Sequence, residues 1–172
     1  PGHLREKGDF MNLYRKTLEG INTAVEYTVC VLIAAMVVVV FLQVVFRFVI
    51  HSSLPWSEEL SRYLMVWITF LGASIAVKRK SHIGVEVVVS LFSDVWKKIA
   101  AIFVSASLCL FFGFMVLYGE KILRTVKFQL SPAMEISMAI PYSALMTGGF
   151  LMFLHSFLQL AENITGRTVS DQ

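Results

Sequence analysis

Long stretches without a charged side chain alternate with short polar segments along the chain. Three such runs are Val29–Phe46 with 18 residues, Ile99–Tyr118 with 20 and Ile136–Leu160 with 25. An α-helix rises about 1.5 Å per residue, so each run can cross a hydrocarbon core of about 30 Å. Because lipid offers backbone groups no hydrogen-bond partners, a helix is the expected form. The pattern therefore predicts three membrane-spanning helices.

A fourth apolar run is shorter and follows a polar helix start. Tyr63–Val77 has 15 residues without a charge, and it crosses a bilayer only if residues 60–62 extend it or neighbouring helices relieve the mismatch. Pro55 favours a first helical position, and the carboxylates of Glu58 and Glu59 favour the positive end of the helix dipole. We predict a fourth spanning helix; a buried re-entrant segment is the alternative.

Together these runs predict an all-α integral membrane protein with four transmembrane helices. The expected membrane domain covers residues 25–160, with an N-terminal segment at 1–24 and a C-terminal tail at 161–172. The chain begins without an initiator Met, so we interpret residues 1–10 as a cloning remnant and assign them no function. The four spans are expected at about 25–50, 60–77, 99–121 and 136–160.

Apolar positions recur at helical spacing in the connection between the second and third spans. They are Val85, Val88, Val89, Phe92, Val95 and Trp96. The spacing predicts a short amphipathic helix on the membrane surface, where Trp96 anchors in the interface and Lys97 and Lys98 contact lipid headgroups. An extended linker rich in β-branched residues is the alternative.

Composition supports a membrane location and indicates its orientation. Hydrophobic residues make up 56% of the 172 residues, charged residues 16%, and the mean hydropathy is +0.70, so the chain holds more apolar surface than a soluble core buries. Of the 15 Lys and Arg residues, ten lie on the side of the termini and five on the other. The positive-inside rule therefore predicts cytoplasmic termini. The net charge of +3 reflects this orientation, and no basic stripe with stacking aromatics indicates nucleic acid binding.

Ionisable side chains, which an autonomous transporter or pump needs inside the membrane, are scarce within the spans. Glu26 and Arg47 lie at the two ends of the first span, where each can reach water. His155 lies within the fourth span, but no second His stands at a similar depth to complete a haem site. Cys30 and Cys109 are single thiols without C-x-x-C spacing. We predict no catalytic residue and no metal site.

The densest polar cluster lies at the outer ends of the first and second spans. Gln43 and Arg47 are four residues apart and form a polar stripe, and Glu58 can pair with Arg62 at the same spacing. Arg47 can also reach a carboxylate of the second helix, Glu58 or Glu59, across the connecting turn. The alternative is a simple membrane boundary with an aromatic anchor.

Three basic residues stand between the third and fourth spans, in what we expect to be a loop over residues 120–135. Lys121, Arg124 and Lys127 give this loop a positive surface, which suits docking of a soluble partner. A solvated connector without a partner is the alternative.

Five motifs are spread over the four predicted spans, and their spacing and residue types agree best between residues 43 and 83. They are Gln43-Val44-x-x-Arg47-Phe48, Leu54-Pro55-Trp56-Ser57-Glu58-Glu59-Leu60-x-Arg62-Tyr63, Trp67-x-x-Phe70-Leu71-Gly72, Lys78-Arg79-x-x-His82-Ile83 and Ser131-Pro132-Ala133-Met134-Glu135-Ile136. Together they resemble the small membrane subunit, of the DctQ/SiaQ type, of tripartite ATP-independent periplasmic (TRAP) transporters.

The resemblance implies a scaffold role in the bacterial inner membrane. Such a subunit joins a large multi-span permease subunit, and a periplasmic substrate-binding protein delivers an organic acid, such as a dicarboxylate or sialic acid, for uptake driven by a sodium gradient. Sodium and substrate bind to the large subunit, so this chain is expected to be no enzyme and to hold no cofactor. Lys121, Arg124 and Lys127 become candidates for receiving the binding protein. Candidates for the subunit interface are Gln43, Arg47, Trp56, Glu58, Glu59, Arg62 and Trp67.

Two other functions stay open at this point. An autonomous four-helix transporter or channel would carry substrate by itself, although the scarcity of charge within the spans argues against ion coupling. A membrane redox subunit would use His155 as a haem ligand. The resemblance favours the scaffold over both.

Overall fold

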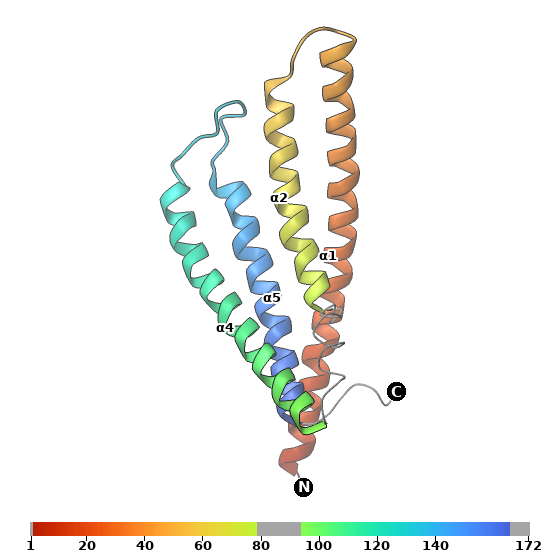
Figure 1. Cartoon of the computed structure of the whole chain (residues 1–172), viewed down its shortest axis with the longest axis vertical. Coiled ribbons are helices and arrows are strands. Elements are labelled where there is room, and N and C mark those ends of the chain that lie inside the picture. The colour runs from red at the N-terminus through yellow and green to blue at the C-terminus, as the bar shows by residue number, and fades with distance from the viewer. Residues whose placement is uncertain (1, 79–93, 166–172) are drawn as a thin grey trace.

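The computed structural model describes residues 2–78 and 94–165, which form four long helices (Figure 1). In these ranges the extended backbone is limited to one isolated bridge. Each helix contains a stretch of 24 to 29 residues that is long and apolar enough to span a membrane. The predicted all-α architecture with four spans is thus confirmed. The helices are α1 (Gly2–Phe48), α2 (Pro55–Lys78), α4 (Asp94–Val126) and α5 (Ala139–Thr165).

The length of the second helix decides between the two forms expected from its short apolar run, a spanning helix and a re-entrant segment. α2 begins at Pro55, the expected start, and has 24 residues, which is enough to cross a bilayer. The polar residues before the apolar run therefore supply the missing length. The amphipathic helix expected between the second and third spans falls on residues 79–93, which lie outside the described residues.

The first helix is much longer than a membrane is thick. Its 47 residues correspond to about 70 Å at the helical rise, against a hydrocarbon core of about 30 Å. The stretch that qualifies as a span is Gly20–Phe48. The segment before it continues the same helix beyond the span (Figure 1).

The helices follow one another in an open row (Figure 1). α1 packs on α2, α2 packs on α5, and α5 packs on α4, and no further pair of helices in the described ranges packs closely backbone to backbone. The two connections, 49–54 and 127–138, lie at one end of the row, here called the hairpin end. The N-terminus and the end of α5 lie at the other, the terminal end.

Burial follows the order of the row. In the most apolar stretch of α1 only 6% of the residues are buried, against 39% in α5. A small apolar core lies where α2, α4 and α5 meet, and it contains Val77, Phe112 and Met152. Large side chains such as Phe103 and Leu110 of α4 are exposed. α5 is therefore the central helix, while α1 contributes mostly outer surface.

A glycine sets the closest approach between α2 and α5. A Cβ atom on Gly148 would lie 2.7 Å from Cβ of Phe70 and 2.9 Å from its carbonyl oxygen. The next residue, Gly149, stands equally close to the end of the Met115 side chain on α4. Small residues allow membrane helices to approach closely, so these two glycines let α5 pack tightly on both neighbours.

We expect Gly148→Ala to lower the thermal unfolding midpoint of the chain in detergent, because the added Cβ meets backbone atoms of Phe70 and overpacking costs about 1–3 kcal/mol. The matched control is Gly72→Ala on α2, where a Cβ meets no atom within 4 Å. That control should be neutral or stabilising, because Ala favours a helix over Gly by about 1 kcal/mol. Unfolding followed by tryptophan fluorescence measures both, and equal midpoints would contradict the close approach.

Candidate functional site

The hairpin end of α2 carries a buried carboxylate. The first turn is fixed by Ser57, whose hydroxyl donates to the carbonyl oxygen of Leu54 at 2.7 Å. Two residues on, Glu59 is only 3% exposed, whereas the neighbouring Glu58 faces outward. Because a buried carboxylate without partners is costly, the groups that hold Glu59 decide the structure of this end.

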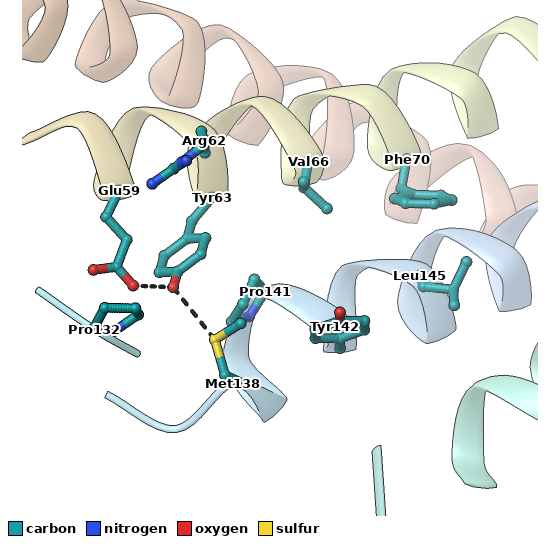
Figure 2. A pocket seen from close by; sticks show the side chains of 10 residues that line it. All are labelled: Glu59, Arg62, Tyr63, Val66, Phe70, Pro132, Met138, Pro141, Tyr142 and Leu145. Atoms are coloured by element: carbon teal, nitrogen blue, oxygen red, sulfur yellow. Dashed lines mark hydrogen bonds between the residues drawn. The ribbon is translucent and has the colours of Figure 1, made fainter. Parts of the chain in front are cut away.

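The connection between α4 and α5 is a folded turn. The amide of Ser131 donates to the carbonyl oxygen of Ile136 at 2.9 Å, and the amide of Met138 donates to that of Gln129 at 2.9 Å. Glu135 has a φ of 52°, a left-handed backbone conformation that tight turns use. The turn lies beside the start of α2 (Figure 2).

Glu59 joins α2 to this turn (Figure 2). Its Oε2 accepts the amide N–H groups of Ala133 at 2.9 Å and Met134 at 3.1 Å. Its Oε1 accepts the hydroxyl of Tyr63, and Sδ of Met138 lies 3.4 Å from that hydroxyl oxygen. Hydrogen bonds to a charged acceptor are stronger than those between neutral groups. This group, called the Glu59 clamp, holds the turn against α2.

A cleft of about 560 Å³ lies between α2 and α5, from the Glu59 clamp towards the Gly148 contact (Figure 2). Its polar rim at the hairpin end consists of Glu59, Arg62 and Tyr63. The volume falls within the range of small-molecule sites, about 300–1,000 Å³. The remaining walls are formed by Val66, Phe70, Pro132, Met138, Pro141, Tyr142 and Leu145. We call this space the α2–α5 cleft.

A second set of polar contacts lies towards the terminal end. His155, Gln159 and Asn163 are spaced four residues apart on α5 and therefore share one face. Each contacts a different helix, so this α5 stripe connects the central helix to the three others. The contacts are His155 Nε2 with Asn22 Oδ1 of α1 at 3.0 Å, Gln159 Nε2 donating to the Val77 carbonyl of α2 at 2.7 Å, and Asn163 Nδ2 donating to Ser105 Oγ of α4 at 2.9 Å.

The residues considered for redox or metal chemistry are not brought together. His155 uses its Nε2 towards Asn22, while His51 stands at the opposite, hairpin end. Cys30 and Cys109 are separate free thiols. Among the described residues, no group of three His, Cys, Asp or Glu side chains has the geometry to hold a metal ion.

Comparison with known protein families identifies the family of the chain. The profile described as Tripartite ATP-independent periplasmic transporters, DctQ component, matches residues 36–166. The chain belongs to the DctQ family. The resemblance seen in the motifs is thereby confirmed, and the matched region contains the Glu59 clamp, the α2–α5 cleft and the α5 stripe. As a DctQ component with four helices able to span a bilayer, the chain is a multi-pass membrane protein of a transporter family.

Relatives of this DctQ-family chain differ in how much of their length it covers. A TRAP transporter small permease protein of Haemophilus influenzae is 30% identical over 145 residues, which is 81% of this chain and 87% of the relative. The C4-dicarboxylate TRAP transporter small permease protein DctQ of Vibrio cholerae is 30% identical over 95 residues, 55% of this chain and 40% of the relative. The sialic acid TRAP transporter permease protein SiaT of H. influenzae is 28% identical over 148 residues, 86% of this chain but 24% of SiaT.

The expected ion pair between Arg47 and a carboxylate of α2 is not present among the described residues. The guanidinium lies 5.9 Å from the ring centroid of Phe48, and no carboxylate of the described residues stands within 4 Å of it. The reason is that Glu59 is held by the 127–138 turn and Glu58 points outward. Gln43, one turn away, is half-buried.

The other interface candidates on α2 are mostly at the surface. Glu58 and Arg62 stand 3.9 Å apart, as their spacing predicts, with side chains 67% and 64% exposed. Such an exposed pair contributes little to stability, so both groups stay available to a partner. Trp56 is exposed and Trp67 is half-buried.

The predicted docking residues do not all lie in a loop. α4 continues to Val126, so Lys121 and Arg124 stand on its last turns, and only Lys127 belongs to the connection. The pairing of Arg124 with Glu120 one turn earlier, at 2.5 Å, supports the longer helix.

All three docking candidates are exposed, but only two keep their positive charge unpaired among the described residues. Lys121 lies 5.1 Å from the ring centroid of Tyr118, and Lys127 lies 5.6 Å from that of Phe128. Arg124 is neutralised by its carboxylate partner. At the terminal end, the lipid candidates Trp96 and Lys98 are exposed.

The side chain of Lys97 lies outside the described part of the chain.

Sequence reasoning missed Gln159 and Asn163, although their spacing from His155 was a visible signal. It gave no signal for the amides of Ala133 and Met134, because every residue carries a backbone N–H and only the folded turn aims these two.

Replacing Glu59 with Gln should loosen the 127–138 turn. The Gln side chain keeps one acceptor oxygen for the amides of Ala133 and Met134, while its NH₂ group can only donate, to the hydroxyl oxygen of Tyr63. The bonds to the turn lose the negative charge that strengthens them. We expect faster hydrogen exchange at residues 131–138, measured by mass spectrometry in detergent. Glu58→Gln is the matched control and should leave exchange unchanged, because the Glu58 side chain is exposed and pairs with Arg62 at the surface. Equal protection in both variants would exclude the clamp.

Proposed function

We propose that this chain is the non-catalytic scaffold subunit of a TRAP uptake system in the bacterial inner membrane. Its partner is a large multi-span permease subunit that binds sodium and substrate. A periplasmic substrate-binding protein delivers an organic acid, and a sodium gradient drives its uptake. The names of the relatives favour a carboxylate such as a C4-dicarboxylate or sialic acid. The hairpin end faces the periplasm and both termini face the cytoplasm.

The open row of helices is the observation that carries this proposal. A transporter that acts alone needs a path enclosed by its helices and ionisable groups inside the membrane. Among the described helices, the backbone of α1 packs on α2 alone, and α1 reaches α5 through the contact of Asn22 with His155. The charged residues of the described spans stand near the helix ends. A row of this kind offers two broad apolar faces, which suits anchoring of a partner that supplies the transport sites.

One relative supports a permease as the partner. A region similar to most of this chain makes up 24% of SiaT, so such a region occurs as one part of a larger permease protein. In this chain the exposed Arg47 at the hairpin end is the proposed polar contact with that partner. It is oriented outward, whereas Glu59 serves the chain itself.

Co-expression with a large TRAP permease subunit tests the proposal. A tag on this chain should retain the large subunit in mild detergent, and vesicles holding both should take up the organic acid only with a sodium gradient and the binding protein. Vesicles holding this chain alone should show no uptake, because the charged groups of the described spans stand near the helix ends. Uptake by this chain alone, or its purification without the large subunit, would overturn the proposal.

The two unpaired cations define a second prediction for the same system. Lys121→Glu with Lys127→Glu should slow association of the binding protein, with the largest effect at low salt, because exposed charges act mainly on encounter rates. Association at two ionic strengths is measured on the reconstituted complex. Lys98→Glu at the terminal end is the matched control and should change nothing. Equal rates for all three proteins would remove Lys121 and Lys127 from the docking surface.

A further inference from the structure

The α2–α5 cleft is held open at both ends by contacts within the chain. At its deep end, Phe70 and Gly148 already touch, so the helices cannot move closer there. At the hairpin end, Glu59 fixes the turn that leads into α5 through the amides of Ala133 and Met134. The two helices therefore form the walls of a wedge that does not close by simple packing, and its volume of about 560 Å³ is available to an occupant.

The walls of the cleft favour a hydrocarbon chain over water. Below the polar rim, Val66, Phe70 and Leu145 present apolar surface, and water needs two to four polar partners to occupy a cavity. From Arg62 to Phe70 the cleft follows α2 for about 12 Å at the helical rise. Tyr142 and Arg62 line it and are also exposed, so the cleft opens at the surface of the helix row, where lipid lies.

The rim of the cleft offers side chains that can bind a lipid headgroup with one negative and one positive charge. Arg62 is 64% exposed and only loosely paired with Glu58 at 3.9 Å, so its guanidinium has donors for a phosphate. The two charged residues of the rim, Glu59 and Arg62, have opposite signs, so the rim itself is neutral. Glu58 stands beside Arg62, outside the lining of the cleft, and this added negative charge disfavours an anionic lipid and favours an ammonium group next to it. The polar end and the apolar end of the cleft thus match the two ends of one molecule.

We propose that the α2–α5 cleft binds a zwitterionic phospholipid, with one acyl chain between Val66, Phe70 and Leu145 and its phosphate at Arg62. The lipid fills the wedge and supports the position of α2 relative to α5. This site lies at the hairpin end, apart from Trp96 and the neighbouring lysines of the terminal end, and it is formed by this chain without a partner.

Photolabelling of the full chain in nanodiscs tests the site. The probe is phosphatidylethanolamine with a diazirine on its acyl chain, in discs of phosphatidylglycerol. Peptides that contain Val66, Phe70 and Leu145 should be labelled at least about tenfold more than those that contain the exposed Phe103 and Phe111 of α4, a ratio that corresponds to about 1.4 kcal/mol of selective binding. In the reverse arm, a phosphatidylglycerol probe in phosphatidylethanolamine discs should not enrich in the cleft.

Two variants with matched controls separate binding from general lipid contact. Leu145→Trp fills the cleft and should abolish its labelling, while Phe111→Trp at an exposed position of α4 should not. Arg62→Gln should lower cleft labelling by about tenfold, the size of one charge-assisted hydrogen bond, while Lys121→Gln should not. Because Arg62 is exposed, its variant keeps the proposal testable if Leu145→Trp does not fold.

Three results in discs with this chain alone would overturn the proposal. They are equal labelling of the cleft and the α4 surface, equal enrichment by the anionic probe, and cleft labelling that Arg62→Gln leaves unchanged. In discs that hold the complex, replacement of the lipid label by crosslinks to a helix of the large subunit would assign the cleft to protein and also overturn it. Since the discs with this chain alone contain no partner, failure here leaves the proposed scaffold function untouched.

Discussion

The polar stripe of α5 is the constraint on which the rest of the structure depends. In lipid, apolar side chains gain little by contacting one another, so close packing and hydrogen bonds between helices set the arrangement. His155, Gln159 and Asn163 reach α1, α2 and α4 respectively. Each such bond contributes only about 0.6 kcal/mol in a membrane, but the three share one helix face and fix its neighbours together. They make α5 the centre of a row that has no closed core.

The two glycines of α5 and the Glu59 clamp fix the helices further along the row, towards the hairpin end. Gly148 brings α5 against Phe70 of α2, while the clamp holds the turn before α5 to the first turns of α2. Between these two fixed points the helices diverge and leave the α2–α5 cleft. The same contacts that stabilise the row therefore create the α2–α5 cleft, an apolar recess with a charged rim.

The row also explains why the chain fits a supporting role. α1 has one close neighbour and exposes most of its apolar surface, so its outward face is free for lipid or for a larger subunit. Several exposed charges of the described residues stand at the hairpin end, on α1, on α2, on the last turns of α4 and in the connection that follows it. The side chains of Arg47, Arg62, Lys121 and Lys127 offer polar contacts without placing charge inside the bilayer. Glu59, in contrast, holds the 127–138 turn of the chain itself.

The sequence by itself determined the features that depend on neighbouring residues. The length of apolar runs determined four spans, Pro55 marked the start of α2, and the i,i+4 spacing placed Glu58 beside Arg62. Tertiary structure alone decided that Glu59 is internal and Glu58 external, that Arg47 reaches neither, and that α5 is the central helix. Those outcomes rest on bonds between residues 58 to 133 positions apart. Local periodicity describes one helix at a time, and it contains no information on which face of a uniformly apolar helix meets which neighbour.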